Sequence, residues 1–172
     1  MCVAYLPITE DDWVSHSTVM KNFKTLHGVP IDNIIEYIKN FLLEKPDTEI
    51  LIGSDSQSFG NFKTVYGTVI ALHMKGRGAH VLCTKETTPF EKEMSVRLIN
   101  EVWKAIEVAE FLRNNELPKA TWIDIDLNPD PKFRSNKVLR QAIGLVQGMG
   151  YKVRYKHNGA MTTYGANHLV RL

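Results

Sequence analysis

The sequence has few of the features that mark several protein classes. Its two cysteines, Cys2 and Cys83, stand far apart, and neither forms a CxxC pattern. We therefore expect neither a disulfide framework nor a zinc site, and a reducing compartment fits. No apolar run approaches the roughly 20 residues of a membrane helix, and the first residues lack a signal-peptide pattern. A cytoplasmic protein without a membrane partner is the expectation.

The chain also lacks a strong charge of either sign, because its formal net charge is only +2. A dedicated electrostatic nucleic-acid binder usually carries a larger imbalance. The basic residues are uneven, however: residues 131–172 contain eight Lys and Arg and no Asp or Glu. Two interpretations stay open for this segment, an ordinary solvated face and a phosphate-binding flank.

Length and composition favour one soluble-type globular domain. The 172 residues are 44% hydrophobic and 23% charged, and no internal repeat or long linker divides them. We expect a single domain over residues 1–172, with 1–46 as an N-terminal helical extension and 47–172 as the core. The role of residues 1–28 stays open.

The order of predicted elements gives the fold class. A helix over about 33–43, capped by Asp32, precedes three strands at 49–54, 64–73 and 79–85. A long helix follows, and then come a strand, a helix starting after Ser135, a fifth strand and a last short helix (92–113, 120–127, 136–147, 151–156 and from 162 or 163). The first three strands form an antiparallel meander. The order predicts an α/β fold of the ribonuclease H-like kind, a mixed five-stranded sheet flanked by helices.

Three segments of this order carry candidate site acids. Asp55 follows the apolar run 50–54, and could be a ligand-binding acid or a turn aspartate. On the long helix, Glu101 lies closest to the buried stripe, with Glu93 as the second choice. Glu101 could also reach solvent or pair with Arg97. Within the expected fold it is the best candidate on the helix.

Asp124 and Asp126 stand two residues apart in the apolar strand 120–127 and point to one face of it. Strand interiors disfavour aspartate, so the two need an explanation. An edge strand with one wet face would give one. Because helical connections flank this strand on both sides, a central position with a functional role is favoured.

Converging carboxylates need a cation, because several of them do not stay ionised together in a dry site. Oxygen ligands without a Cys or His cluster indicate Mg²⁺ or Mn²⁺ rather than zinc. Two such ions activate a water and stabilise the leaving oxygen in phosphodiester cleavage. The acids therefore predict a metal-dependent phosphoryl-transfer site.

The segment 52–57, Ile-Gly-Ser-Asp-Ser-Gln, resembles the I-G-T-D-S-Q signature of the YkuK-type ribonuclease H-like family of bacteria and phages. The similarity continues through residues 97–101, 107–109, 123–125 and 146–153, and more weakly through 165–168. The resemblance implies a ribonuclease H-like fold with the family's three acids at Asp55, Glu101 and Asp124. Asp126 stands where the family often has glycine, and ranks second.

Two positions depart from the family pattern. Asn158 and Asn167 each stand where the family tends to have a carboxylate, so each brings an amide without charge. Asn167 can still offer its carbonyl oxygen to a metal. The departures weaken the second metal position that the resemblance implies.

Two functions follow as expectations. The first is a metal-dependent nuclease or related phosphodiester hydrolase that acts on nucleic acid. Asp55, Glu101 and Asp124 would bind Mg²⁺ or Mn²⁺, Asp126 or Asn167 would complete the site, and His157 or His168 would assist proton transfer. The second, favoured by the two amides and the low net charge, is a non-catalytic nucleic-acid-binding or assembly module. The substrate (RNA, DNA, hybrid or junction) and the oligomeric state stay open.

Overall fold

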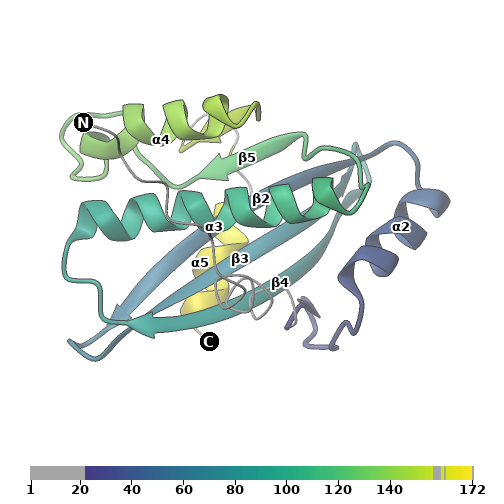
Figure 1. The fold of residues 1–172 in the computed structure, drawn as a ribbon, viewed down its shortest axis with the longest axis horizontal. Helices are drawn as coiled ribbons and strands as arrows, with labels where there is room; N and C mark the ends of the chain where they lie inside the picture. Colours follow the sequence, from purple (N-terminus) through teal and green to yellow (C-terminus); the bar gives the residue numbers. More distant parts are fainter. Residues whose placement is uncertain (1–21, 157–159, 161, 172) are drawn as a thin grey trace, which may run out of the picture.

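A six-stranded mixed sheet forms the centre of the computed structural model, which describes residues 22–156, 160 and 162–171 (Figure 1). The sheet order is β1-β4-β3-β2-β5-β6. β1 to β4 pair antiparallel, whereas β2, β5 and β6 pair parallel. The strands are β1 (Lys24–Thr25), β2 (Thr48–Phe59), β3 (Lys63–Met74), β4 (Gly78–Pro89), β5 (Trp122–Ile125) and β6 (Val153–Tyr155).

The expectation of five strands is wrong by one. β1 has two residues and pairs antiparallel with β4, opposite Cys83 and Leu82. So short a segment has no periodicity of its own, and it is extended because its backbone bonds the edge of β4. The antiparallel meander and the mixed α/β architecture are confirmed.

The meander strands are longer than the sequence pattern indicated. β2 and β3 pair without interruption from Thr48 opposite Met74 to Phe59 opposite Lys63. Asp55 therefore lies inside β2 rather than at its end, and it is opposite Gly67. The interpretation of Asp55 as a turn aspartate is wrong, because residues 56–59 continue the strand.

Helices cover both faces of the sheet. Figure 1 shows α3 (Met94–Asn114) and α4 (Asn136–Gly148) in front of it and α5 (Thr162–Arg171) behind it. α2 (Ile34–Glu44) lies toward the end of the sheet that begins β2. The described part of the chain contains no helix with both the length and the apolar character needed to span a membrane.

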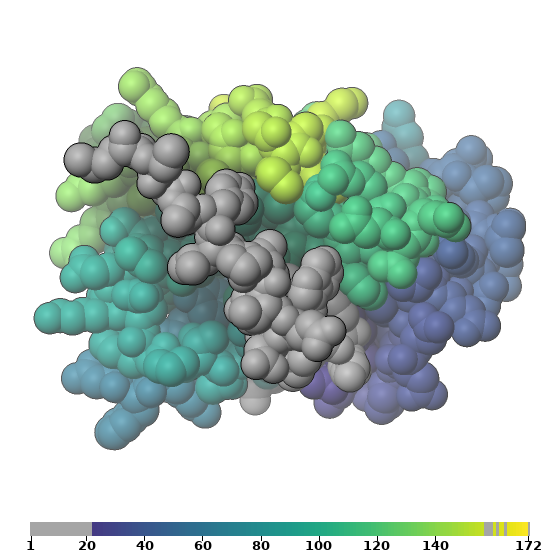
Figure 2. Space-filling view, viewed as in Figure 1, coloured from purple at the N-terminus to yellow at the C-terminus, as the bar shows by residue number. Residues whose placement is uncertain are grey.

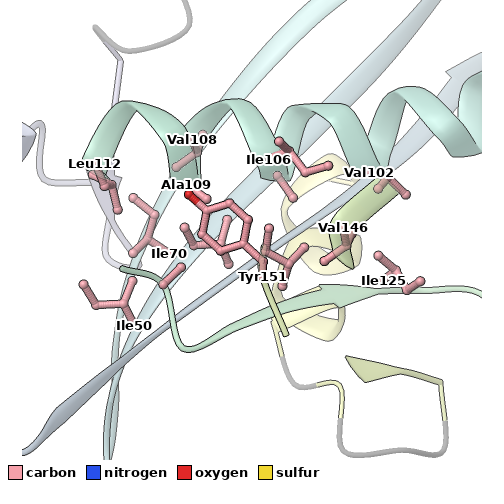
Figure 3. Packing of buried hydrophobic residues seen from close by; sticks show 14 of the residues in the cluster. Ile50, Ile70, Val102, Ile106, Val108, Ala109, Leu112, Ile125, Val146 and Tyr151 are labelled. Atoms are coloured by element: carbon pink, nitrogen blue, oxygen red, sulfur yellow. The ribbon is translucent and has the colours of Figure 1, made fainter. Parts of the chain in front are cut away.

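The main core lies between the sheet and the front helices. Figure 3 shows Ile50 and Ile70 of the sheet beneath the part of α3 that carries Val108 and Leu112. Farther along α3, Val102 lies above Ile125 of β5, with Val146 of α4 near them. Full burial of such side chains stabilises the fold by about 1.5–3 kcal/mol each. This core fixes the position of α3 on the sheet, and thus the position of its acids.

α5 packs closely on the opposite face because two glycines lie beneath it. A Cβ atom at Gly53 would come within 2.3 Å of Thr162 Oγ1, and one at Gly67 within 2.8 Å of Val170 Cγ1. Any side chain at either position would displace α5. Gly53, the glycine two residues before Asp55 in the signature, therefore has a packing role.

Helix caps differ from expectation in two places. The cap of α2 is Asn33 rather than Asp32, because the Asn33 side chain accepts from the backbone N–H groups of Ile35 and Glu36. Ser135 precedes α4 as expected, but its hydroxyl accepts from the N–H of Asn128 instead of capping the helix. It thereby fixes the loop between β5 and α4.

Candidate active site

The parallel pairing of β2 with β5 brings the candidate acids together. The register places Gly53 opposite Asp124, and both strands run toward the side of the molecule where α3 begins (Figure 1). Asp55 and Asp126 each come two residues later. Glu101, Asp124 and Asp126 line one crevice that is too narrow to admit water. The gathering of acids from β2, α3 and β5 rests on this register.

Glu101 is buried, with 4% of its surface exposed. The Ser56 hydroxyl donates to Glu101 Oε1 at 2.5 Å. Arg97 Nη1 donates to the carbonyl oxygen of Ser56 at 2.9 Å and to its hydroxyl oxygen at 3.0 Å. Arg97 therefore acts on Glu101 through Ser56. Glu101 neither reaches solvent nor forms a direct ion pair with Arg97, the two alternatives that the sequence had left open.

Neither Asp55 nor Glu101 forms an ion pair with a Lys or Arg among the described residues, and the charges of Arg97 and Arg171 do not offset the effect of burial. Burial raises the pKa of Asp55 to about 6, and the nearby Asp126 adds to this, while a hydrogen bond from the Ser56 backbone and the charge of Arg97 oppose it. Burial also raises the pKa of Glu101 well above its ordinary value, and the charge of Asp55 raises it further. Two close carboxylates without a compensating charge favour the protonated form. A bound cation would supply the missing charge.

Asp124 has a different environment, although it is even more buried, at 1% exposure. Arg154 of β6 binds it through two nitrogens, Nε to Oδ1 at 2.7 Å and Nη2 to Oδ2 at 2.9 Å. Thr162, the first residue of α5, donates its backbone N–H and its hydroxyl to Oδ2 at 2.9 and 2.8 Å. Asp124 thus joins β5, β6 and α5. The edge-strand interpretation is wrong, because β5 lies between β2 and β6.

Asp126 lies just beyond the end of β5 and is partly exposed. Its Oδ1 is 3.4 Å from Lys156 Nζ. From the sequence, two interpretations stayed open for the basic residues of the last quarter, a solvated face and a phosphate-binding flank. Arg154 and Lys156 instead pair with Asp124 and Asp126. Arg154 lies opposite Asp124 because β6 pairs with β5. The sequence could not predict this ion pair, since it does not show which strand neighbours β5.

None of the remaining predicted site residues forms a hydrogen bond with Asp55, Glu101 or Asp124 within the described ranges, and some of them lie outside those ranges. Asn167 lies half-buried on α5, and within the described ranges no hydrogen bond joins it to Asp55, Glu101 or Asp124. His168 is exposed on the same helix, and Glu93 is exposed just before α3. His157 and Asn158 lie outside the described residues.

The chemistry of the acids fits a hard divalent cation. Their donors are carboxylate oxygens, with the Ser56 hydroxyl beside them, and such ligands suit Mg²⁺ or Mn²⁺. Within residues 22–156, 160 and 162–171, no three Asp, Glu, His or Cys side chains already have the spacing of a metal site. The fit is therefore in donor type, burial and missing charge. Asp126 would join Asp55 and Glu101 by exchanging Lys156 for the cation.

The sheet has an antiparallel meander followed by parallel strands, and acids from β2, α3 and β5 gather at one side of it. This arrangement defines a ribonuclease H-like α/β domain. The comparison with protein families agrees, because the model described as Ribonuclease H-like matches residues 33–171. The chain belongs to the ribonuclease H-like family. Comparison with curated proteins found no match.

Proposed function

We propose that this protein is a metal-dependent nuclease or related phosphodiester hydrolase that acts on nucleic acid, with Asp55 and Glu101 at the centre of its site. The observation that carries this proposal is that Ser56, the neighbour of Asp55 in β2, donates to Glu101 of α3, so that two buried carboxylates lie near each other. Neither forms an ion pair with a Lys or Arg among the described residues. Burying an uncompensated charge is costly, so such a pair is expected only where function requires it.

Asp55 and Glu101 would hold Mg²⁺ or Mn²⁺, with Asp126 as the third ligand. The cation would activate a water molecule and stabilise the leaving oxygen of the phosphodiester. Ser56 fixes the orientation of the Glu101 carboxylate, and Arg97 fixes that of Ser56. These hydrogen bonds hold one ligand in place before the cation arrives.

Asp124 and Asn167, both favoured by the sequence as ligands, rank behind Asp126 in this proposal. Both Asp124 oxygens already accept hydrogen bonds, and a cation there would compete with the guanidinium of Arg154. Asn167 contributes no charge. A cation at Asp126 would have to replace only one longer contact, which the carboxylate makes with the partly exposed Lys156.

The basic segment that follows β5 supports a nucleic-acid substrate. Figure 1 shows the loop between β5 and α4 on the side toward which β2 and β5 run, and in Figure 2 this green segment projects from the left edge of the molecule. Four exposed basic side chains belong to it or to the first turns of α4 (Lys132, Arg134, Lys137 and Arg140). They are suited to contact phosphate groups.

The test is metal-dependent cleavage of labelled RNA, DNA, hybrid and branched substrates, with Asp55→Asn as the paired variant. Glu44→Gln, an exposed carboxylate on α2, is the matched control. We expect cleavage that needs Mg²⁺ or Mn²⁺, persists in the control and is lost in Asp55→Asn. Unchanged cleavage by Asp55→Asn would remove this site from the proposal.

A second candidate function is a nucleic-acid-binding or assembly module without catalysis. The pairing of Asp124 with Arg154 favours it, because this pairing gives one of the expected acids a purely structural partner. Nucleic-acid binding without cleavage of any substrate, together with no detectable Mg²⁺ or Mn²⁺ affinity at millimolar concentration, would support this function instead.

A further inference from the structure

We propose that the groove between α3 and the ends of β3 and β4 binds one unpaired nucleobase, with a preference for bases that carry an exocyclic amino group. The inference rests on the proposed nuclease function and specifies the nucleic acid it acts on. The groove has a volume of about 510 Å³, and its walls include Tyr66, Phe90, Asn100 and Trp103. Pockets of this size take small ligands and single nucleotides.

The groove adjoins the candidate acids directly. Asn100 precedes Glu101 on α3, and Tyr66 pairs across the sheet with Ser56, the residue that donates to Glu101. Asn100 Nδ2 also donates to the Tyr66 hydroxyl at 3.4 Å. A base in the groove would thus place its own sugar and phosphate next to the carboxylate pair.

Aromatic rings give the groove faces on which a base can stack. Trp103 is 40% exposed although it lies in the middle of α3, so its ring meets solvent at the groove. Phe90 and Tyr66 line the same space. Bases stack on aromatic side chains in most single-strand binding sites, whereas the bases of a duplex are already stacked and paired.

The charge of the groove favours the base over the phosphate. Glu91 and Glu107 line it, and its cation, Lys104, is paired with Glu86 at 2.6 Å. A phosphate group would be repelled by this excess of carboxylates. A carboxylate does accept hydrogen bonds from an exocyclic amino group, as in the pairing of Glu with cytosine N4. Cytosine, adenine and guanine carry such a group, while uracil and thymine do not.

The groove and the basic segment would bind different parts of a nucleic acid, the groove a base and the basic segment the phosphate backbone. The groove has aromatic rings and carboxylates, whereas the loop between β5 and α4 carries the exposed cations Lys132 and Arg134. In Figure 1 the end of β4, whose residues line the groove, and the loop between β5 and α4 lie on opposite sides of the first turns of α3. A strand whose backbone lies on the basic segment would cross the carboxylate pair and insert a base into the groove.

The experiment is fluorescence anisotropy with labelled 12-mers of dC, dT, rC and rU and a mixed duplex, with the full chain in EDTA so that nothing is cleaved. We expect single strands to bind more tightly than the duplex, and the C oligomers several-fold more tightly than T or U. Comparison of the DNA with the RNA oligomers shows whether a difference in affinity comes from the sugar or from the base. Equal affinity for C and T oligomers, or a duplex bound as tightly as the single strands, would overturn the inference.

Variants assign the binding to the groove. Trp103→Leu should weaken single-strand binding by about tenfold, the loss of one stacking contact, while Trp103→Phe keeps a ring and most of the affinity. Glu107→Gln should reduce the preference for C without reducing T binding, and Glu44→Gln should change neither. Thermal melts confirm folding.

A Trp103→Leu protein that is folded and binds as tightly as wild type would overturn the inference. Since these titrations contain no metal, that result would leave the proposed cleavage untouched. In the other direction, unchanged cleavage by Asp55→Asn together with the expected single-strand binding would remove the proposed active site and leave the groove inference standing.

Discussion

Asp124 and Glu101 are almost equally buried, yet their carboxylates are compensated in opposite ways. Asp124 accepts two hydrogen bonds from Arg154 and two from Thr162. Glu101 has a single hydroxyl donor, Ser56, and a second carboxylate, Asp55, close enough to raise its pKa. Removing one partner of a buried, hydrogen-bonded ion pair is strongly destabilising, whereas a buried acid beside another acid destabilises the fold unless a ligand binds. The difference separates a structural acid from a candidate catalytic one.

The largest effect should come from removing the Asp124 carboxylate. Asp124→Ala leaves the largely buried guanidinium of Arg154 without this carboxylate partner and removes the acceptor of the two hydrogen bonds that Thr162 donates. We expect a loss of about 3–5 kcal/mol in the free energy of unfolding, measured by urea denaturation. Asp126→Asn is the control, and it should cost about 0–1 kcal/mol because its ion pair is partly exposed. If Asp124→Ala lowered the free energy of unfolding no more than Asp126→Asn does, Asp124 would not be the structural acid that this comparison makes it.

Removing the charge of Asp55 should have the opposite effect and increase the free energy of unfolding. Its pKa of about 6, against an ordinary value of 3.8, means that the folded protein binds the proton more tightly than the unfolded chain. Stability of the metal-free protein should therefore decrease as pH rises from about 4 through about 6. Asp55→Asn should reduce this decrease, to which the raised pKa of Glu101 also contributes, and raise the free energy of unfolding at pH 7.5 by about 1–3 kcal/mol.

The measurement is urea denaturation in EDTA at several pH values between 4 and 8, with wild type and Asp55→Asn side by side. A wild type that gains stability over the same rise in pH, or an Asp55→Asn protein less stable than wild type at pH 7.5, would contradict the assignment. Added Mg²⁺ or Mn²⁺ should stabilise wild type and leave Asp55→Asn unchanged, because ligand binding to the folded state alone adds to its stability.

A smaller effect is expected at Lys156. Its ammonium is 3.4 Å from Asp126 and would compete with a cation for that carboxylate. Lys156→Gln should change the free energy of unfolding by less than about 1 kcal/mol, since the pair is partly exposed. Mn²⁺ affinity should rise a few-fold, as calorimetry would detect. Lys152→Gln, just before β6 with its ammonium over the Trp122 ring, should leave the affinity unchanged. Equal affinities for all three proteins would argue against Asp126 as a ligand.

The sequence predicted the meander, the long helix and the crossover elements because each has a clear hydrophobic period or turn signal. It missed β1, whose two residues are extended only through pairing with β4. It also ended β2 too early, because Ser56 to Ser58 look like a loop in isolation. Their strand conformation depends on Thr64 to Tyr66, which lie across the sheet.

For the site, local pattern could select the acids but not their partners. Asp55, Glu101 and Asp124 stand out because strands and buried helix faces disfavour carboxylates. The roles of Arg154 and Thr162 depend on β6 and α5 lying next to β5, which is a property of the topology. Without those partners the acids look alike, and only the structure distinguishes Asp124 from the other two.

The most direct test of the account is Mn²⁺ binding followed by electron paramagnetic resonance on the folded protein, with no nucleic acid present. Glu101→Gln is compared with Glu107→Gln, the same substitution on the same helix away from the carboxylate pair. We predict that wild type and Glu107→Gln bind Mn²⁺ with equal affinity and that Glu101→Gln binds it at least about tenfold more weakly. Even the loss of a residue that only hydrogen-bonds to a metal ligand typically lowers metal affinity by about that factor. Equal Mn²⁺ affinity of Glu101→Gln and wild type would contradict the central claim that Asp55 and Glu101 form the metal centre.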